Sequence, residues 1–187
     1  MKNRSLLPYF IVPALPLLVP LVAMRFTEEV QWTASDFVIA YVLLAGAGFV
    51  YRLVTMKAET LAHRVAAALG AGTGLLLIWV NLAVGFIGSE DNPANLLYGA
   101  VVAVGLIGAA FARLEPQRMS GVLFATAATQ FLVPIVAWLI WRPGFDLNVL
   151  KIFILNGVFV VLFVVSGLLF RTTRSKPGNL SDEGVAA

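Results

Sequence analysis

Long apolar runs separated by short polar segments form the main pattern of the chain. A transmembrane helix needs about 20 mostly apolar residues to cross the ~30 Å hydrocarbon core of a bilayer. Charged residues fall almost entirely outside runs of this length, which cover residues 6–24, 37–55, 65–87, 95–112, 121–141 and 152–170. The pattern predicts an all-α, polytopic transmembrane helix bundle of six spans. We expect these spans to form a single domain over residues 1–170.

The first run, LLPYFIVPALPLLVPLVAM, differs from the others because it holds four of the nine prolines. Proline removes an intrahelical hydrogen bond and kinks a helix. The basic start of this run, with Lys2 and Arg4, also resembles a cleaved signal peptide. LVAM is a poor small-x-small cleavage site and the apolar run is long, which favours a retained span. Cleavage would leave five spans and the same orientation.

Lysine and arginine are distributed unequally between the two sets of predicted loops. Short loops that are rich in these residues stay on the cytoplasmic side of a membrane. One side has only Arg25, Arg142 and Lys151. The other side has Lys2, Arg4, Arg52, Lys57, Arg64, Arg113, Arg118, Arg171, Arg174 and Lys176. We therefore predict cytoplasmic termini (N-in/C-in) and a disordered cytoplasmic tail over residues 171–187.

The composition agrees with a bilayer environment. Of the 187 residues 60% are hydrophobic and 12% charged, whereas about a quarter of the residues in a soluble domain are charged. The basic residues are not gathered into a patch, so nucleic acid is not an expected partner. The chain has no cysteine and a single histidine, His63, so we expect no metal, no cofactor and no catalytic residue. We place His63 at the surface, on a cytoplasmic connector.

Small residues gather on one face of the third run. At 100° per residue Gly70, Gly74 and Gly85 lie within one arc of a helix. In lipid, such a face lets two backbones approach closely, and the resulting van der Waals contact drives helix association. The fourth run has Gly105 and Ala109 at the same four-residue spacing. We therefore predict a tight antiparallel hairpin of spans three and four, with these five residues at helix contacts.

Amide side chains occur in the interior of the third, fifth and sixth predicted spans, at Asn81, Gln130 and Asn156. Asn81 lies on the small-residue face of the third run, and an amide that met only hydrocarbon there would be costly. We therefore expect it to bond to Gln130 or Asn156. The carbonyl of Gln130 is also left open because Pro134, four residues later, has no N–H to donate.

The stretch GFIGSEDNPANLLYG, residues 85–99, joins the third and fourth runs. Asn92 and Pro93 are typical of a helix N-cap followed by the first helical position. Glu90 and Asp91 precede them, near the positive end of the following helix dipole. One interpretation is a polar pocket in the outer half of the bundle, formed by Asn81, Gln130, Asn156, Glu90 and Asp91. The other, which we favour, is that the amides only fix helix packing beneath two solvated acids.

The segment WVNLAVGFIGSEDNPAN, residues 79–95, resembles small uncharacterised bacterial membrane proteins of similar length. The resemblance extends over the helical core of the chain. It implies a multi-pass protein of the bacterial cytoplasmic (inner) membrane. No activity is assigned to these proteins, so the resemblance transfers no site residue.

Charged residues are missing from the central turns of every predicted span, whereas proton-coupled carriers and voltage sensors normally need them. We therefore expect a non-enzymatic protein that packs its helices against a second copy or a larger membrane complex, with the lipid bilayer around it. One alternative is permeation of a small solute or ion past the amide pocket. A further alternative is a membrane enzyme acting on a lipid or isoprenoid, using the acids at 28–29 and 90–91.

Overall fold

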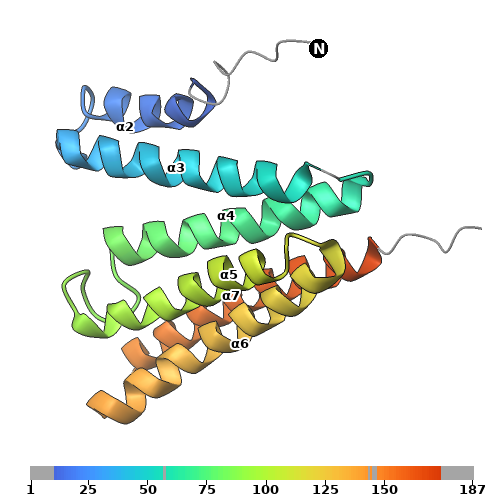
Figure 1. Cartoon of the computed structure of the whole chain (residues 1–187). Coiled ribbons are helices and arrows are strands. Elements are labelled where there is room, and N and C mark those ends of the chain that lie inside the picture. The colour runs from blue at the N-terminus through green and yellow to red at the C-terminus, as the bar shows by residue number, and fades with distance from the viewer. Residues whose placement is uncertain (1–10, 57, 143, 145–146, 174–187) are drawn as a thin grey trace, which may run out of the picture.

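The computed structural model describes residues 11–56, 58–142, 144 and 147–173, which form helices joined by short loops (Figure 1). Within these ranges no strand is present. The elements in chain order are η1 (Val12–Leu17), α2 (Leu18–Ala23), α3 (Ala34–Thr55), α4 (Leu61–Ala83), η2 (Pro93–Leu97), α5 (Tyr98–Phe111), α6 (Pro116–Trp141) and α7 (Leu147–Thr172).

Five helical stretches are long and apolar enough to cross a membrane: α3, α4, η2 with α5 (Pro93–Phe111), α6 and α7. They confirm the predicted all-helical architecture and support a multi-pass membrane bundle. The described part of the first predicted span is a short apolar helix, Val12–Ala23, while residues 6–10 lie outside the described ranges. At the other end α7 continues to Thr172, so the first residues of the predicted tail are helical. Residues 174–187 lie outside the described part.

Local signals in the sequence set several helix ends. The Thr33 N–H donates to Oδ2 of Asp36 at 2.7 Å and completes a capping box at the start of α3. The Thr60 hydroxyl accepts from the N–H of His63 at 3.2 Å and caps α4. Pro116 occupies the first turn of α6, where its missing N–H leaves no helical bond unmade.

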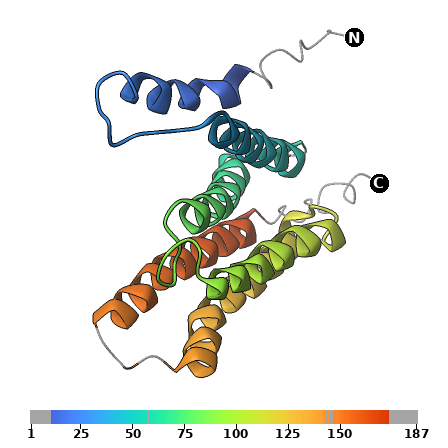
Figure 2. The ribbon, with the colours of Figure 1, turned by 90° about the vertical axis from the view of Figure 1, so that its left-hand side faces the viewer.

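Helices α4, α5, α6 and α7 form one packed body, to which α3 is attached through α4 (Figures 1 and 2). Helices α6 and α7 pack along each other, α4 packs on α7, and α5 packs on α6. Helix α3 lies between α4 and η1 and is held mainly by these two elements. Figure 2 shows α3 standing away from the pair formed by α5 and α6.

The predicted tight hairpin of spans three and four is wrong, because α4 and α5 share few contacts. The small face of α4 packs on α7 instead, where the Ser166 hydroxyl donates to the carbonyl of Ala66 at 2.8 Å. A Cβ on Gly70 would lie 3.0 Å from Oγ of Ser166. The small face of α5 packs on α6, where a Cβ on Gly108 would meet Val122 at 2.7 Å. The spacing of small residues indicates that another helix can pack closely against this face. It does not identify which helix does so.

The prediction of a surface histidine is also wrong. His63 is 4% exposed, and its Nε2 lies 3.0 Å from the carbonyl oxygen of Val54. Its ring meets the ring of Phe170 edge-on, with 5.4 Å between centroids. A carbonyl in the last turn of a helix has no intrahelical donor, and here the imidazole lies beside one. His63 thus joins the end of α3, the start of α4 and the end of α7.

Candidate functional site

The loop between α4 and α5 is organised by the side chain of Asn95. Its Oδ1 accepts from the N–H groups of Phe86 at 3.0 Å and Ile87 at 2.9 Å. Its Nδ2 donates to the carbonyls of Ser89 at 2.7 Å and Ile87 at 3.4 Å. Asn95 is buried, so these bonds are shielded from water. One amide therefore folds the loop back over the end of the bundle.

Gly85 has a different role from the predicted helix contact. It lies after the end of α4 with φ of 77°, a left-handed conformation that glycine adopts without steric cost. A Cβ there would lie 2.5 Å from the carbonyl oxygen of Ser89 and 2.7 Å from Nδ2 of Asn95. Gly85 is therefore required by the turn.

Asn81 belongs to the same loop and does not bond to Gln130 or Asn156 as expected. Its Nδ2 donates to the backbone carbonyl of Asn95 at 3.2 Å. Its Oδ1 is buried and has no hydrogen-bond partner. Because α4 ends two residues after Asn81, the side chain reaches the returning chain before it can reach α6 or α7.

Glu90 and Asp91 are exposed at the tip of the loop. The predicted cap beside them is confirmed, because Oδ1 of Asn92 accepts from the N–H of Ala94 at 2.9 Å and Pro93 opens η2. The acids therefore lie next to a helix start.

Gln130 and Asn156 lie together in the interior, at a junction of α5, α6 and α7. Nε2 of Gln130 donates to Oδ1 of Asn156 at 2.8 Å, and the Tyr98 hydroxyl donates to the same oxygen at 3.0 Å. Nδ2 of Asn156 donates to the carbonyl of Ile152 at 2.8 Å. The exposed fractions of Gln130 and Asn156 are 0% and 2%. The polar groups of Tyr98, Gln130 and Asn156 are therefore used in hydrogen bonds within the bundle, although Oε1 of Gln130 has no partner.

The five residues of the candidate polar pocket thus divide into two groups. Asn81 lies beneath the loop that carries Glu90 and Asp91, whereas Gln130 and Asn156 form a separate buried contact. Asn81, Gln130 and Asn156 line neither of two apolar cavities in the bundle.

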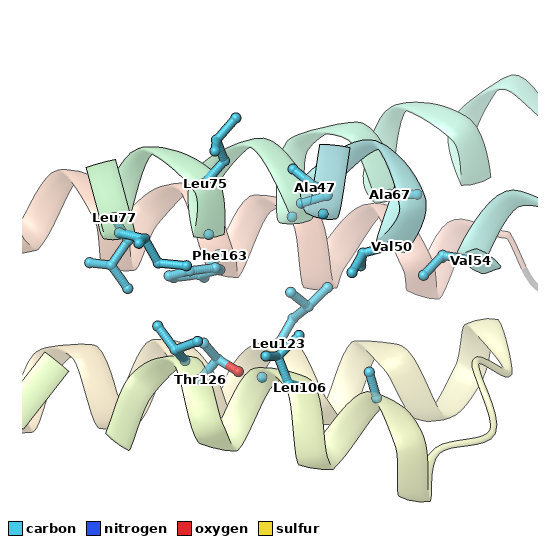
Figure 3. A pocket seen from close by; sticks show the side chains of 18 of the residues that line it. Ala47, Val50, Val54, Ala67, Leu75, Leu77, Leu106, Leu123, Thr126 and Phe163 are labelled. Atoms are coloured by element: carbon cyan, nitrogen blue, oxygen red, sulfur yellow. The ribbon is translucent and has the colours of Figure 1, made fainter. Parts of the chain in front are cut away.

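An apolar groove of about 350 Å³ separates α3 and α4 from α5 and α6, with α7 beside it (Figure 3). Figure 3 shows Val50 and Leu77 on one side of it and Leu106 and Thr126 on the other. A smaller cavity of about 160 Å³ lies between η2, α6 and α7 near Trp138.

The groove changes the interpretation of the remaining small residues. A Cβ on Gly74 would meet nothing within 4 Å, so Gly74 widens the groove and makes no helix contact. Gly105 and Ala109 line it from α5, and a Cβ on Gly105 would lie 3.6 Å from Oγ1 of Thr126 on α6. The groove occupies the space where the predicted hairpin contact would have been.

Three polar residues with clear roles were not singled out from the sequence: Asn95, Tyr98 and Ser166. Asn95 stands within the quoted loop stretch, where an asparagine after two glycines and an N-cap signals side-chain bonding to a turn. Ser166 and Tyr98 are typical membrane-helix residues, and nothing in their spacing names their partners.

The fold and the groove define a class, an all-helical, multi-pass bundle with an intramembrane apolar groove. The residues that the structure describes include no group of three or more His, Cys, Asp or Glu side chains placed to hold a metal ion. Comparisons with protein-family models, curated proteins and solved structures gave no match to the chain.

Proposed function

We propose that this protein is a non-enzymatic component of the bacterial cytoplasmic membrane that acts by helix association, with a second copy or within a larger membrane complex. The proposed arrangement has six spans with both termini in the cytoplasm. The low burial of α3 is the observation that supports this function.

Helix α3 is the least enclosed of the five long helices. Its most apolar 18-residue stretch is 11% buried, compared with 39% for α6. Large apolar side chains on α3 that lie outside the groove lining are exposed, among them Val38 and Ile39. Gly48 is exposed, and a Cβ on it would meet nothing within 4 Å. An exposed helix backbone in lipid is open to close approach by another helix.

The proposal is tested with Gly48→Leu. Gly48 lies outside the groove lining, and a leucine there points into open space, so we expect the fold to remain intact while the approach of a second helix is blocked. The matched control is Gly121→Leu, at an equally open and exposed glycine on α6. The measurement is crosslinking in native membranes, followed by light scattering of the protein in mild detergent.

We expect wild type and Gly121→Leu to give the same associated species and Gly48→Leu to lose it. A strictly monomeric wild-type protein that recovers no crosslinked partner would remove the proposal.

A further inference from the structure

The large apolar groove extends to one end of the bundle. Its lining comes from residues 42–54 of α3, 67–78 of α4, 101–109 of α5, 119–126 of α6 and 163–170 of α7. These ranges are the later part of α3 and α7, the earlier part of α6, and the middle of α4 and α5. Val54 and Phe170 lie within two residues of the last residues of α3 and α7, so the groove reaches the end of the bundle where these helices finish. Figure 1 shows the ends of α3, α5 and α7 on the same side of the bundle.

The surface of the groove is suited to hydrocarbon. Thr126 is the one lining residue with a polar side chain, and its hydroxyl already donates to the carbonyl of Val122 at 2.9 Å. Gly46 and Gly74 leave its walls without side chains on α3 and α4. Water gains no hydrogen bond in such a space. An alkyl chain that enters it replaces contacts with neighbouring lipid chains by contacts with the apolar side chains of the groove.

The end of the bundle that the groove reaches is basic. Among the described residues, the acids at this end are Glu59 and Glu115. The arginines at this end are Arg52, Arg64, Arg113, Arg118 and Arg171. The opposite end has an acidic excess, with Glu28, Glu29, Asp36, Glu90 and Asp91 against Arg25, Arg142 and Lys151.

Arg171 lies at the end of α7 that the groove reaches, although neither it nor Phe124 lines the groove. It follows Phe170, a lining residue, and its guanidinium carbon lies 4.6 Å from the centroid of the Phe124 ring. Stacking on an aromatic face leaves the N–H groups of an arginine at its edge, where they can pair with a phosphate. Arg118 precedes the lining residue Met119 and forms a 2.9 Å ion pair with Glu115.

We propose that the groove holds one acyl chain of an anionic phospholipid, whose phosphate is bound by the arginines at the basic end. The apolar lining selects an alkyl chain, and the charge excess at one end selects a negative headgroup over a zwitterionic one. The site lies apart from the face of α3 proposed for association, because Val38, Ile39 and Gly48 do not line the groove.

The first experiment fills the groove from either wall. Gly74→Leu and Gly46→Leu each place a side chain in the groove without meeting protein atoms within 4 Å of the new Cβ. The control is Gly72→Leu, two residues along α4, at an equally open position outside the lining. Each full-length protein is purified in mild detergent and incubated with phosphatidylglycerol or phosphatidylcholine of identical acyl chains. Native mass spectrometry then counts the bound lipid.

We expect wild type and Gly72→Leu to bind phosphatidylglycerol equally, and both groove variants to bind it about tenfold more weakly. Circular dichroism and the thermal midpoint report whether each variant is folded. Equal binding by Gly74→Leu, Gly46→Leu and Gly72→Leu would overturn the proposal. So would a change in oligomeric state of the groove variants with unchanged lipid binding, since this would mean that a second copy occupies the groove.

The second experiment tests the headgroup. Arg171→Gln should reduce the preference for phosphatidylglycerol over phosphatidylcholine, and added salt should reduce it in wild type. Arg142→Gln, at the opposite end, should leave the preference unchanged. Equal affinity of wild type for the two lipids would overturn the assignment of an anionic headgroup.

Discussion

Asn95 shows how much structure one side chain can determine at the residue scale. Its amide satisfies two backbone N–H groups and two carbonyls in a loop that would otherwise leave them unpaired at the bundle end. An unpartnered buried polar group costs about 1–3 kcal/mol. Removing the amide would therefore leave these backbone N–H and carbonyl groups without a hydrogen-bond partner.

We predict that Asn95→Ala opens this loop. The N–H groups of Phe86 and Ile87 lose their acceptor, so the thermal midpoint should fall and the loop should become a site of proteolysis. The control is Asn92→Ala, which removes a single cap bond worth about 1 kcal/mol. The same cleavage rate in both variants would show that Asn95 does not organise the loop.

The buried amide contact leads to an asymmetric prediction. Asn156→Leu leaves the Tyr98 hydroxyl and Nε2 of Gln130 without their acceptor, whereas Gln130→Leu also removes an oxygen that has no partner. We expect Asn156→Leu to lower the thermal midpoint more than Gln130→Leu. The change for Gln130→Leu should stay within about 1 kcal/mol, since such bonds average ~0.6 kcal/mol in membrane bundles. A larger loss for Gln130→Leu would contradict this order.

At the scale of the element, α4 presents two different faces to its surroundings. Gly70 lies against α7 and α6, where a Cβ would meet Oγ of Ser166 at 3.0 Å and Cδ2 of Leu123 at 3.3 Å. Gly72 lies on another face, where a Cβ meets nothing within 4 Å. These two glycines, separated by one residue, therefore differ in whether the surrounding structure has room for a larger side chain.

We predict that Gly70→Leu destabilises the protein and Gly72→Leu does not. Forcing a larger side chain into a packed contact costs about 1–3 kcal/mol, and the Ser166 bond to α4 would be strained as well. The check is the thermal midpoint of both variants in the same detergent. Equal midpoints would mean that the contact between α4 and α7 can move apart without cost.

At the scale of the whole molecule, the charges divide between the two ends of the bundle. The arginine-rich end includes the turns between α3 and α4 and between α5 and α6, and the acidic loop lies at the other end (Figure 1). The proposed orientation places the arginine-rich end in the cytoplasm.

The orientation can be tested directly because the chain has no cysteine of its own. Glu90→Cys and Glu59→Cys change exposed residues at opposite ends of the bundle. In intact cells we expect a membrane-impermeant maleimide to label the first variant and to label the second only after permeabilisation. The reverse labelling pattern would invert the proposed topology.

The existence of the long helices and some of their ends could be read from the sequence. Apolar length and local caps such as Thr33 with Asp36 and Asn92 with Pro93 act within a few residues of the chain. The site was only partly predictable. Gln130 and Asn156 were expected as bonding candidates and do meet, while Asn81 was expected to join them and bonds to Asn95 instead.

What the sequence determined by itself was the helical, membrane-compatible character of the chain, because the transfer of each segment into lipid depends on its own residues. Only the tertiary structure decided that α4 packs on α7, that α5 packs on α6, and that a groove is left between the two pairs. Close packing depends on the shapes of two faces together. Gly70 and Gly74 both border the groove, yet a Cβ on Gly70 would meet Ser166 whereas a Cβ on Gly74 would meet nothing within 4 Å.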